Sequence, residues 1–544
     1  MWLVVLALVG LPAMCQKLES GDLRQHLNSL PLPGSGSESF QIPAAENLAA
    51  FRGVMETALQ GEFARAATQA DRLGYDLVRY TDAPSSRIYT LLRERAGGGG
   101  QGTYVFRPEA CRRLVFQAPH AGGDANTGRQ SIDLFLRLDA AGLFLPGTHR
   151  CANRQASPCE GTTTVCAGSP QAYPVSDVAH FTRSYFQAAH EVAARAMDNA
   201  IFVQMHGFTW EPGDPDLMIS NATCQRLPRS IATQLSGAFE EAFQSRGSGL
   251  SAGSCNAAGG PARLCAQTNV QARFLAGAAD PCQCAGGGST CASSSACPQT
   301  LPYPERFLHI EQSCATREFT TCSRPGRFSF EDTAQVFERF FPCTPALRAV
   351  THGATFEQEA LAPGTIYSVF GEHIPADVRV TACEQPAAVL HSGGGQVNGV
   401  LAESRLGGSC QVRLSLGQSH AVPFLSNSLT VATVEQALAL FRHDGLAIIT
   451  HADGTLVNEA SPARPGEIVV LWGTGGGLTD AQMRLAKGPE ITIDGAAVAI
   501  HYAGRAPGFL GLDQMNVVVP ETAQAGRRAL AIQGRRYEIW IGER

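Results

Sequence analysis

Up to Cys343, segments with an apolar residue every three or four positions alternate with short apolar runs. The first pattern predicts amphipathic helices and the second predicts buried strands. The clearest helical segment runs from Glu46 to Leu73, where the apolar positions are Leu48, Phe51, Met55, Leu59, Phe63 and Ala67. Further helices are expected at Ile132–Leu143, Ser176–Met197, Pro228–Gln244 and Phe330–Phe341, and strands at Asp76–Tyr80, Arg87–Leu92, Thr103–Phe106, Leu114–Phe116, Ala200–Met205 and within Leu301–Gln312. This alternation predicts an α/β domain with a mostly parallel sheet over residues 46–343.

From Thr344 onward the helical period nearly disappears, with Val434–Phe441 as the main exception, and short β-branched runs alternate with Gly/Pro turns. An internal repeat underlies this region, because Pro363–Gly371 (PGTIYSVFG) matches Pro465–Gly473 (PGEIVVLWG), 102 positions later. That spacing is close to the length of one immunoglobulin-like sandwich. We therefore expect two tandem all-β immunoglobulin-like sandwiches, at 344–455 and 456–544.

The chain opens with an apolar segment, residues 1–15, that is too short to span a bilayer and is followed by polar sequence. Such a segment predicts a cleaved secretory signal peptide, with Ala13-Met14-Cys15 as the small-x-small cleavage motif. A lipoprotein anchored through Cys15 is the less favoured alternative, because Pro12 and Met14 fit a lipobox poorly. Residues 16–45, which include the stretch PLPGSGS, are predicted to be an exposed leader.

The cysteines also indicate export. The chain has 17 cysteines, and removal of Cys15 leaves an even number, as full pairing in an oxidising compartment requires. Cys383 and Cys410 lie apart from the others and are expected to pair with each other. The Gly/Ala/Ser/Cys-rich insertion at 247–302 cannot build a core and lacks paired Cys-x-x-Cys knuckles, so disulfides are favoured over a zinc cluster. We expect a secreted protein, either extracellular or periplasmic.

The charge and composition argue against a nucleic-acid partner and against a membrane span. The formal net charge is −6, and no basic patch indicates a nucleic-acid partner. No apolar run after the signal peptide is long enough for a membrane span. The chain also lacks a Gly-x-Ser-x-Gly elbow for a serine nucleophile, and the glycine stretch at 97–102 lacks the Lys-Ser/Thr of a P-loop.

The candidate chemistry lies where three apolar runs end. The first run stops at Ala118-Pro119-His120-Ala-Gly-Gly-Asp124, the second ends in His206-Gly207, and the third carries Glu311 near its end. Loops at the carboxyl ends of parallel strands surround a common crevice, so these side chains are expected to meet. Two imidazoles and one carboxylate can hold a catalytic zinc ion, and a separate glutamate can accept a proton from water. The two carboxylates also have structural alternatives: Asp124 could cap a helix that begins near Thr127, and Glu311 could face solvent.

The same motifs resemble the N-formylglutamate amidohydrolase and poly-γ-glutamate hydrolase group, which is related to the zinc carboxypeptidases. The resemblance covers roughly residues 75–340. It implies that His120, Asp124 and His206 bind Zn²⁺ and that Glu311 is the catalytic general base. It also implies that Asn153 and Arg154 bind a substrate carboxylate. Arg150 is a second candidate for that contact, and the neighbouring His149 is an alternative ligand.

The C-terminal region has its own resemblance. Pro363–Gly371 is similar to the opening strands of transcription-factor-type immunoglobulin (IPT/TIG) domains. The region from Ala362 to Pro520, which includes YAGRAPGFLGLDQMNVVVP, resembles the C-terminal domain of many large secreted proteins of Acidobacteria, the Solibacter-type family. Such tails follow many unrelated front domains, so this resemblance implies cell-surface association rather than a chemistry.

The sequence therefore predicts a secreted zinc-dependent hydrolase that cleaves an amide or peptide bond in an acidic, glutamyl-type substrate. The expected substrate is a small molecule, a peptide or a polyglutamate-like chain. A zinc carboxypeptidase that acts on peptides or cell-wall stem peptides rather than on γ-glutamyl chains is a further possibility. The alternative is a non-catalytic extracellular binding or adhesion protein whose metal site has decayed.

Overall fold

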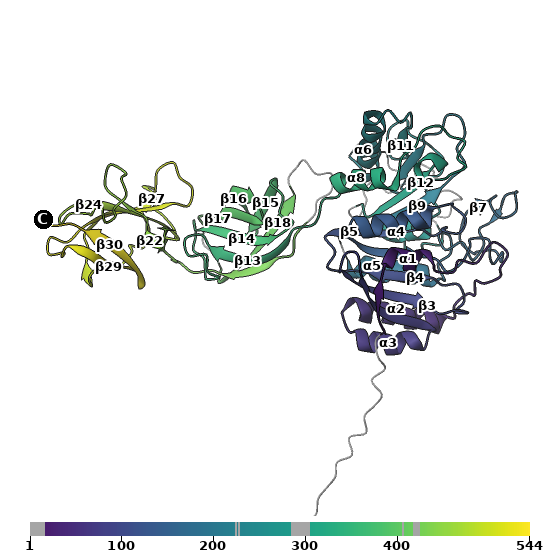
Figure 1. The fold of residues 1–544 in the computed structure, drawn as a ribbon, viewed down its shortest axis with the longest axis horizontal. Helices are drawn as coiled ribbons and strands as arrows, with labels where there is room; N and C mark the ends of the chain where they lie inside the picture. Colours follow the sequence, from purple (N-terminus) through teal and green to yellow (C-terminus); the bar gives the residue numbers. More distant parts are fainter. Residues whose placement is uncertain are drawn as a thin grey trace, which may run out of the picture. The chain divides into compact units, whose positions relative to one another are not determined.

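The computed structural model describes residues 17–197, 199–223, 226, 229–283, 305–404, 407–416 and 425–544. The predicted signal peptide and residues 284–302 of the predicted Cys-rich insertion lie outside the described residues. The chain divides into two compact units, Met1–Cys343 and Thr344–Arg544, which are coloured purple to teal and green to yellow in Figure 1.

The first unit is built on a ten-stranded sheet with the order β1-β2-β3-β4-β6-β5-β9-β12-β10-β11. Its strands are β1 (Lys17–Gly21), β2 (Tyr75–Asp82), β3 (Ile88–Glu94), β4 (Thr103–Phe106), β5 (Arg112–Gln117), β6 (Ala140–Leu145), β9 (Ile201–Gly207), β10 (Leu217–Ser220), β11 (Ala252–Ser254) and β12 (Phe307–Gln312). A separate two-stranded sheet pairs β7 (Thr162–Thr163) with β8 (Gln171–Ala172).

The predicted mostly parallel sheet is wrong, because this sheet is mixed. The strands β6, β5, β9 and β12 run parallel to one another. The path β2-β3-β4-β6 is antiparallel throughout, and β10 is antiparallel to β12. Hydrophobic spacing indicates that a strand exists but not its direction, and the glycine-rich connection at 95–102 turns β3 back into an antiparallel neighbour.

Helices cover both faces of the sheet. They are α1 (Leu23–Asn28), α2 (Ala45–Leu59), α3 (Phe63–Asp71), α4 (Thr127–Arg137), α5 (Tyr185–Ala196), α6 (Ile231–Ser245), α7 (Val270–Leu275) and α8 (Phe330–Phe340), with a 3₁₀ turn, η1 (Cys314–Thr316). The first helical layer contains α2, α3, α5 and α7, and the second contains α1, α4, α6 and α8. Val115 belongs to the core formed with the first layer, whereas its neighbour Phe116 contacts Phe337 of α8.

Three local predictions in this unit need correction. The long helix predicted from Glu46 to Leu73 is two helices, α2 and α3, and the break contains Gly61 with a φ of 82°. The second half of the predicted helix Ile132–Leu143 forms the central strand β6, because α4 ends and Asp139 adopts a left-handed conformation. The predicted exposed leader instead contributes the edge strand β1 and helix α1, with Phe40 fully buried.

The second unit is antiparallel β structure. Its strands are β13 (Ala346–His352), β14 (Ile366–Glu372), β15 (Val378–Ala382), β16 (Gln385–Gly393), β17 (Gln396–Val400), β18 (Ser409–Leu416), β19 (Leu429–Ala432), β20 (Ala439–Leu440), β21 (Arg442–His443), β22 (Leu446–Ala447), β23 (Ile449–Thr450), β24 (Ile468–Thr474), β25 (Ile491–Ile493), β26 (Ala496–Ala497), β27 (Ile500–Arg505), β28 (Asp513–Val518), β29 (Gly526–Ile532) and β30 (Arg535–Ile541).

The prediction of two tandem immunoglobulin-like sandwiches is also wrong in its arrangement. Strands β13 to β19 form one connected path of seven strands around one hydrophobic core, rather than two separate facing sheets. A five-stranded sheet and a four-stranded sheet follow around a second core. Both parts cluster into one compact unit, and the helical periodicity of Val434–Phe441 forms the short strand β20 instead of a helix.

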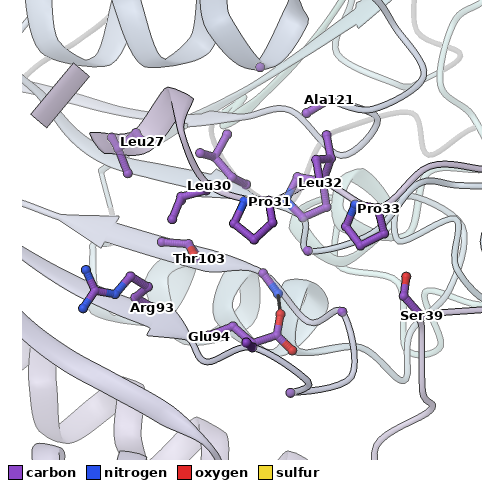
Figure 2. A pocket seen from close by; sticks show the side chains of 18 of the residues that line it. Leu27, Leu30, Pro31, Leu32, Pro33, Ser39, Arg93, Glu94, Thr103 and Ala121 are labelled. Atoms are coloured by element: carbon purple, nitrogen blue, oxygen red, sulfur yellow. Dashed lines mark hydrogen bonds between the residues drawn. The ribbon is translucent and has the colours of Figure 1, made fainter. Parts of the chain in front are cut away.

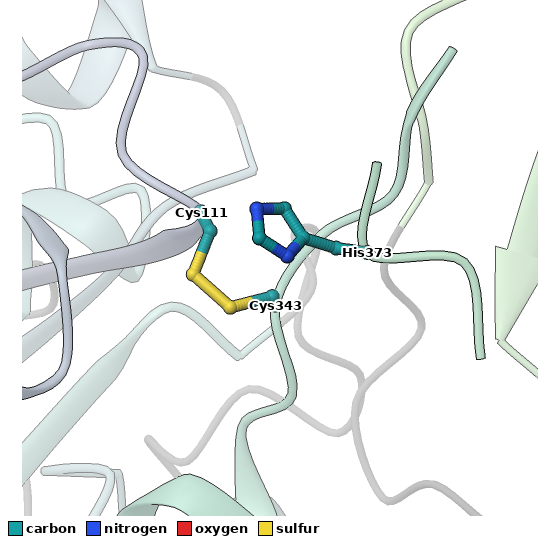
Figure 3. A group of neighbouring side chains, drawn as sticks. All are labelled: Cys111, Cys343 and His373. Atoms are coloured by element: carbon teal, nitrogen blue, oxygen red, sulfur yellow. A yellow bond between two sulfur atoms is a disulfide. The ribbon is translucent and has the colours of Figure 1, made fainter. Parts of the chain in front are cut away.

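Twelve cysteines form six disulfides among the described residues: Cys111–Cys343, Cys151–Cys166, Cys159–Cys282, Cys255–Cys265, Cys314–Cys322 and Cys383–Cys410. The predicted disulfide bonding, including the pairing of Cys383 with Cys410, is confirmed for these residues. Figure 3 shows the bond between Cys111 and Cys343, which ties the start of the β5 region to the end of the first unit. None of the helices in the described ranges has the length and apolar character that a membrane crossing requires.

Candidate metal centre

The candidate centre lies on one face of the central strands, where that face changes from apolar to polar. In β9 the side chains of Phe202, Gln204 and His206 share this face because side chains alternate along a strand. In the parallel register of β9 with β12, Phe202 is paired with Phe307 and His206 with Glu311. The strands therefore begin in the hydrophobic core and end in a cluster of buried polar groups.

The structure brings the three predicted metal ligands together. The Nδ1 atoms of His120 and His206 are 3.1 Å apart, and Asp124 Oδ2 lies 3.4 Å from the first and 3.6 Å from the second. In a tetrahedral site, two ligand atoms are about 1.63 times as far from each other as each is from the metal. Zinc–ligand distances of about 2.0–2.2 Å therefore require ligand atoms about 3.3–3.6 Å apart. The two separations to Asp124 fall within this range and the separation of the two Nδ1 atoms is about 0.2 Å shorter than its lower end, so the three atoms approximate one face of a tetrahedral site. Each residue is at most 5% exposed.

The chain positions His120 through a second carboxylate that the sequence analysis did not identify. His120 Nε2 lies 2.9 Å from Asp177 Oδ1, and Asp177 is 1% exposed. A carboxylate can only accept here, so Nε2 carries the proton and Nδ1 presents a lone pair. This carboxylate–histidine contact is typical of metal-binding imidazoles. No local motif marks Asp177, which lies 57 positions from His120 in the sequence.

Two hydrogen-bond donors also fix the carboxylate of Asp124. Its Oδ1 accepts from the Arg150 guanidinium, and its Oδ2 accepts from the backbone N–H of Gly207 at 3.1 Å. The N-cap of α4 is Asn126, in a left-handed conformation, so the alternative assignment of Asp124 as the helix cap is wrong. An aspartate with one oxygen fixed by Arg150 and the other turned toward two imidazoles is oriented as a ligand.

Glu311 lies beside the imidazoles rather than facing solvent. It is 7% exposed, its Oε1 is 3.6 Å from His309 Nε2, and its Oε2 is buried without a hydrogen-bond partner in the described residues. One oxygen of Glu311 and one nitrogen each of His206 and His309 lie within 4.8 Å of one another. The ring of His309, which the sequence analysis did not assign to the site, packs against that of His206 with centroids 4.3 Å apart and an interplanar angle of 35°.

The predicted substrate-binding residues separate into two groups. Arg150 reaches the centre through Asp124 and is largely buried. Asn153 instead serves the loop, because its Nδ2 donates to the Phe40 carbonyl and its Oδ1 accepts from the Gln155 N–H. Arg154 is exposed, and within the described part of the chain no hydrogen bond or ion pair joins it to His120, Asp124 or His206. The alternative ligand His149 accepts from the Cys151 N–H through Nδ1 and does not join the ligand cluster.

Burial dominates the electrostatics. It lowers the pKa of His120 and, together with the neighbouring His120, holds the pKa of His206 well below its ordinary value. Both imidazoles are therefore neutral near pH 7, as metal coordination requires. Burial raises the pKa of Glu311 to about 7, although the Arg150 guanidinium opposes that shift. Burial also acts to raise the pKa of Asp177, but His120 and His180 outweigh it and keep this carboxylate ionised.

A separate cavity of about 630 Å³ is lined in part by Ala121, and Figure 2 shows Leu30, Pro31, Leu32, Pro33, Glu94 and Ala121 along its wall. Ala121 follows His120 directly, yet none of the three ligands lines this cavity. Glu94 Oε2 accepts from the Gly102 N–H, so the carboxylate holds the end of the glycine stretch at 97–102. The cavity is thus distinct from the metal centre.

Comparisons with known proteins assign no family. No protein-family model matches the chain, and no curated protein matches it. Parts of the chain are similar to the Prevotella bryantii surface glycan-binding protein PbSGBP-B (10% identity, 36% of this chain and 41% of that one, TM-score 0.14). Parts are also similar to the plexin A4 extracellular region (12%, 43% and 24%, TM-score 0.17) and to the titin I9–I11 tandem (7%, 44% and 71%, TM-score 0.13). This chain spans less than half of the first two proteins, and such low TM-scores support no argument about fold or function.

Proposed function

We propose that the first unit is a zinc-dependent hydrolase that cleaves an amide bond in an acidic substrate. The observation that carries the proposal is the convergence of two imidazole Nδ1 atoms and one carboxylate oxygen at 3.1–3.6 Å. His120 presents a lone pair to this point because Asp177 accepts from its other nitrogen. A buried lone pair facing a carboxylate oxygen is unfavourable unless a cation lies between them.

The donor set suits zinc, which takes imidazole nitrogen and carboxylate oxygen and leaves one position open with three protein ligands. When bound, Zn²⁺ supplies a Lewis acid that makes water nucleophilic near neutral pH. Glu311 is the group that takes up the proton, because its pKa of about 7 matches that of an efficient general base. Its Oε2 is buried and free of protein hydrogen bonds among the described residues, so it is available for this exchange.

The charge around Glu311 supports an acidic substrate. Arg150, Arg317 and Arg263 all act electrostatically on the Glu311 carboxyl. Arg317 packs over Gly207 and donates to the Ala125 carbonyl, so it borders the ligand loop. A substrate carboxylate would be attracted to this cationic surround, and Arg150, whose Nε makes no hydrogen bond within the described residues, is the residue we assign to that contact.

The disulfides support a location outside the reducing cytoplasm, and we place the enzyme in the extracellular or periplasmic space. The second unit has no group of ligands comparable to the metal centre among its described residues. We assign it an accessory role, such as association with the cell surface.

Metal analysis of the purified protein tests the proposal. Wild type, His120→Ala and His149→Ala are compared by inductively coupled plasma mass spectrometry after purification without chelator. We expect about one zinc per chain in wild type and His149→Ala and loss of zinc in His120→Ala. His149→Ala is the matched control because it removes a nearby imidazole that is not a ligand. Folded wild-type protein without zinc would refute the metal centre.

A hydrolysis assay then tests the reaction. Glutamyl amides, N-acylglutamates and neutral amides are compared with wild type and with Glu311→Gln, which keeps the size of the side chain but cannot accept the proton. Turnover of the acidic substrates that is abolished in Glu311→Gln is the expected result. Zinc-loaded protein that hydrolyses none of them would refute the proposed reaction while leaving the metal centre intact.

A further inference from the structure

A cluster of buried amide side chains lies directly beneath the metal centre. Its members are at most 1% exposed and are contributed by β5, β9, α5 and the turn of α7: Gln117, Gln187, Gln204, Asn269 and Gln271. Buried amides must satisfy their hydrogen bonds internally, so each must take one orientation. The orientation of the whole cluster can be deduced from two backbone groups at its edges.

The first fixed point is the Val178 carbonyl. Gln271 Nε2 lies 2.9 Å from this oxygen, which can only accept, so the nitrogen of Gln271 must face it. The oxygen of the same amide then faces Gln204 at 3.0 Å. Gln204 must therefore donate from Nε2 in this direction, as it also does to Gln117 Oε1 at 3.0 Å.

The second fixed point is the start of α7. The Ala272 N–H can only donate, and it is 2.9 Å from Asn269 Oδ1. The nitrogen of Asn269 consequently faces Gln204 and donates to its Oε1 at 2.8 Å. Two independent backbone groups thus place the Gln204 oxygen on the same side, where His206 Nε2 lies 3.1 Å away.

We propose that Gln204 is a positioning residue that fixes the proton of His206 on Nε2 and so makes Nδ1 available to the metal. An oxygen whose orientation is fixed can only accept from the imidazole, which favours the Nε2–H tautomer over the one in which His206 Nδ1–H donates to His120 Nδ1 at 3.1 Å. Asp177 likewise fixes the proton of His120 on Nε2, through a charged carboxylate. Gln204 fixes that of His206 through a neutral amide oxygen. The inference rests on the proposed metal centre but concerns a property of the metal-free chain.

Proton placement is measured directly by long-range ¹H–¹⁵N correlation spectra of ¹⁵N-histidine-labelled, metal-free protein, with His206 assigned by its absence in His206→Asn. The variants are Gln204→Met, which removes both polar groups at similar volume, and Gln204→Glu, which keeps an acceptor toward His206. We expect the Nε2–H tautomer in wild type and Gln204→Glu, and a mixture of tautomers in Gln204→Met. Zinc affinity, measured by competition with a chromophoric chelator, should fall 10–100-fold in Gln204→Met.

Gln187→Met is the matched control. Gln187 accepts from Gln271 and donates to Glu191, so its loss perturbs the same cluster but leaves the contact between Gln204 and His206. We expect a loss of stability without a change in the His206 tautomer. A proton on Nδ1 in folded wild type, or an unchanged tautomer in folded Gln204→Met, would overturn the inference. Wild type with the Nε2–H tautomer but without zinc would refute only the proposed function.

Discussion

The disulfide Cys111–Cys343 should contribute more to the stability of the first unit than any short-range disulfide in it. It joins residues 232 positions apart and fixes the region where β5 begins, and β5 leads to His120. Replacing both cysteines by serine removes this constraint from the unfolded chain while the other disulfides stay. The matched control is the Cys314→Ser/Cys322→Ser variant, whose disulfide spans only 8 positions.

Chain entropy gives the expected difference. A disulfide lowers the entropy of the unfolded chain by an amount that grows with the logarithm of the loop it closes. Cys159–Cys282 already closes 123 of the 232 positions, so the loop opened by losing Cys111–Cys343 is about 110 residues. This corresponds to about 4.8 kcal/mol at 25 °C, against about 2.5 kcal/mol for the control.

Urea unfolding measures both losses. Trp210 reports on the first unit when Trp472 and Trp540 of the second unit are replaced by phenylalanine in all variants. The midpoint should fall about twice as far in the Cys111/Cys343 variant as in the control. Equal losses would show that local packing around each disulfide, and not loop closure, sets its contribution.

Two further outcomes follow from the electrostatics. Asp177→Asn keeps an acceptor for His120 but removes its charge, so zinc affinity should fall 10–100-fold in a chelator competition titration, and an unchanged affinity would contradict the role of Asp177. In the second unit, the hydrogen bond to Glu467, followed by that to the Ser461 carbonyl, raises the pKa of His451 above its ordinary value. This stabilisation is present below about pH 6.5 and is lost as the pH rises through the folded-state pKa, so Glu467→Gln should lower the His451 pKa in an NMR titration.

The sequence was most informative about local elements whose pattern depends on near neighbours. The strands that end near His120 and His206 and the helix near Phe330 form close to their predicted bounds as β5, β9 and α8. The predictions were wrong where an apolar run is compatible with both a helix and a strand. Residues 140–145 continue the helical spacing of α4, yet they are buried on both faces and form the central strand β6. Burial on both faces removes the alternation that distinguishes a strand from a helix.

The strand directions could not be predicted for a different reason. The pairing of β10 with β12 brings together segments about 90 positions apart, and their antiparallel order depends on how the connection between them folds. Residues 284–304 of that connection lie outside the described part of the chain. Hydrophobic spacing carries no information on such a connection, and the mostly parallel sheet was inferred from the alternation of elements alone.

The candidate metal centre contains residues whose proximity the sequence predicts and residues whose contacts it does not. The proximity of His120, Asp124 and His206 could be predicted because they follow strand ends, but the contacts of Asp177 and Arg150 with them could not, since these form only when distant segments meet. One signal was nevertheless present within the strands. Gln204 lies two positions before His206, and His309 lies two before Glu311, so each polar pair occupies one face of a strand whose preceding positions on that face are apolar.

Burying such a polar pair in a strand destabilises the fold unless the amide and the imidazole find hydrogen-bond partners. The pairs are tolerated only where the facing elements supply fixed donors and acceptors. Here Asn269 donates to Gln204, and Gln271, which itself donates to the Val178 carbonyl, accepts from it. In β9, Gln204 and His206 at positions i and i+2 are such a pair, and their hydrogen-bond partners are supplied from the facing elements. The orientation of Gln204 then determines which nitrogen of His206 faces the proposed metal centre.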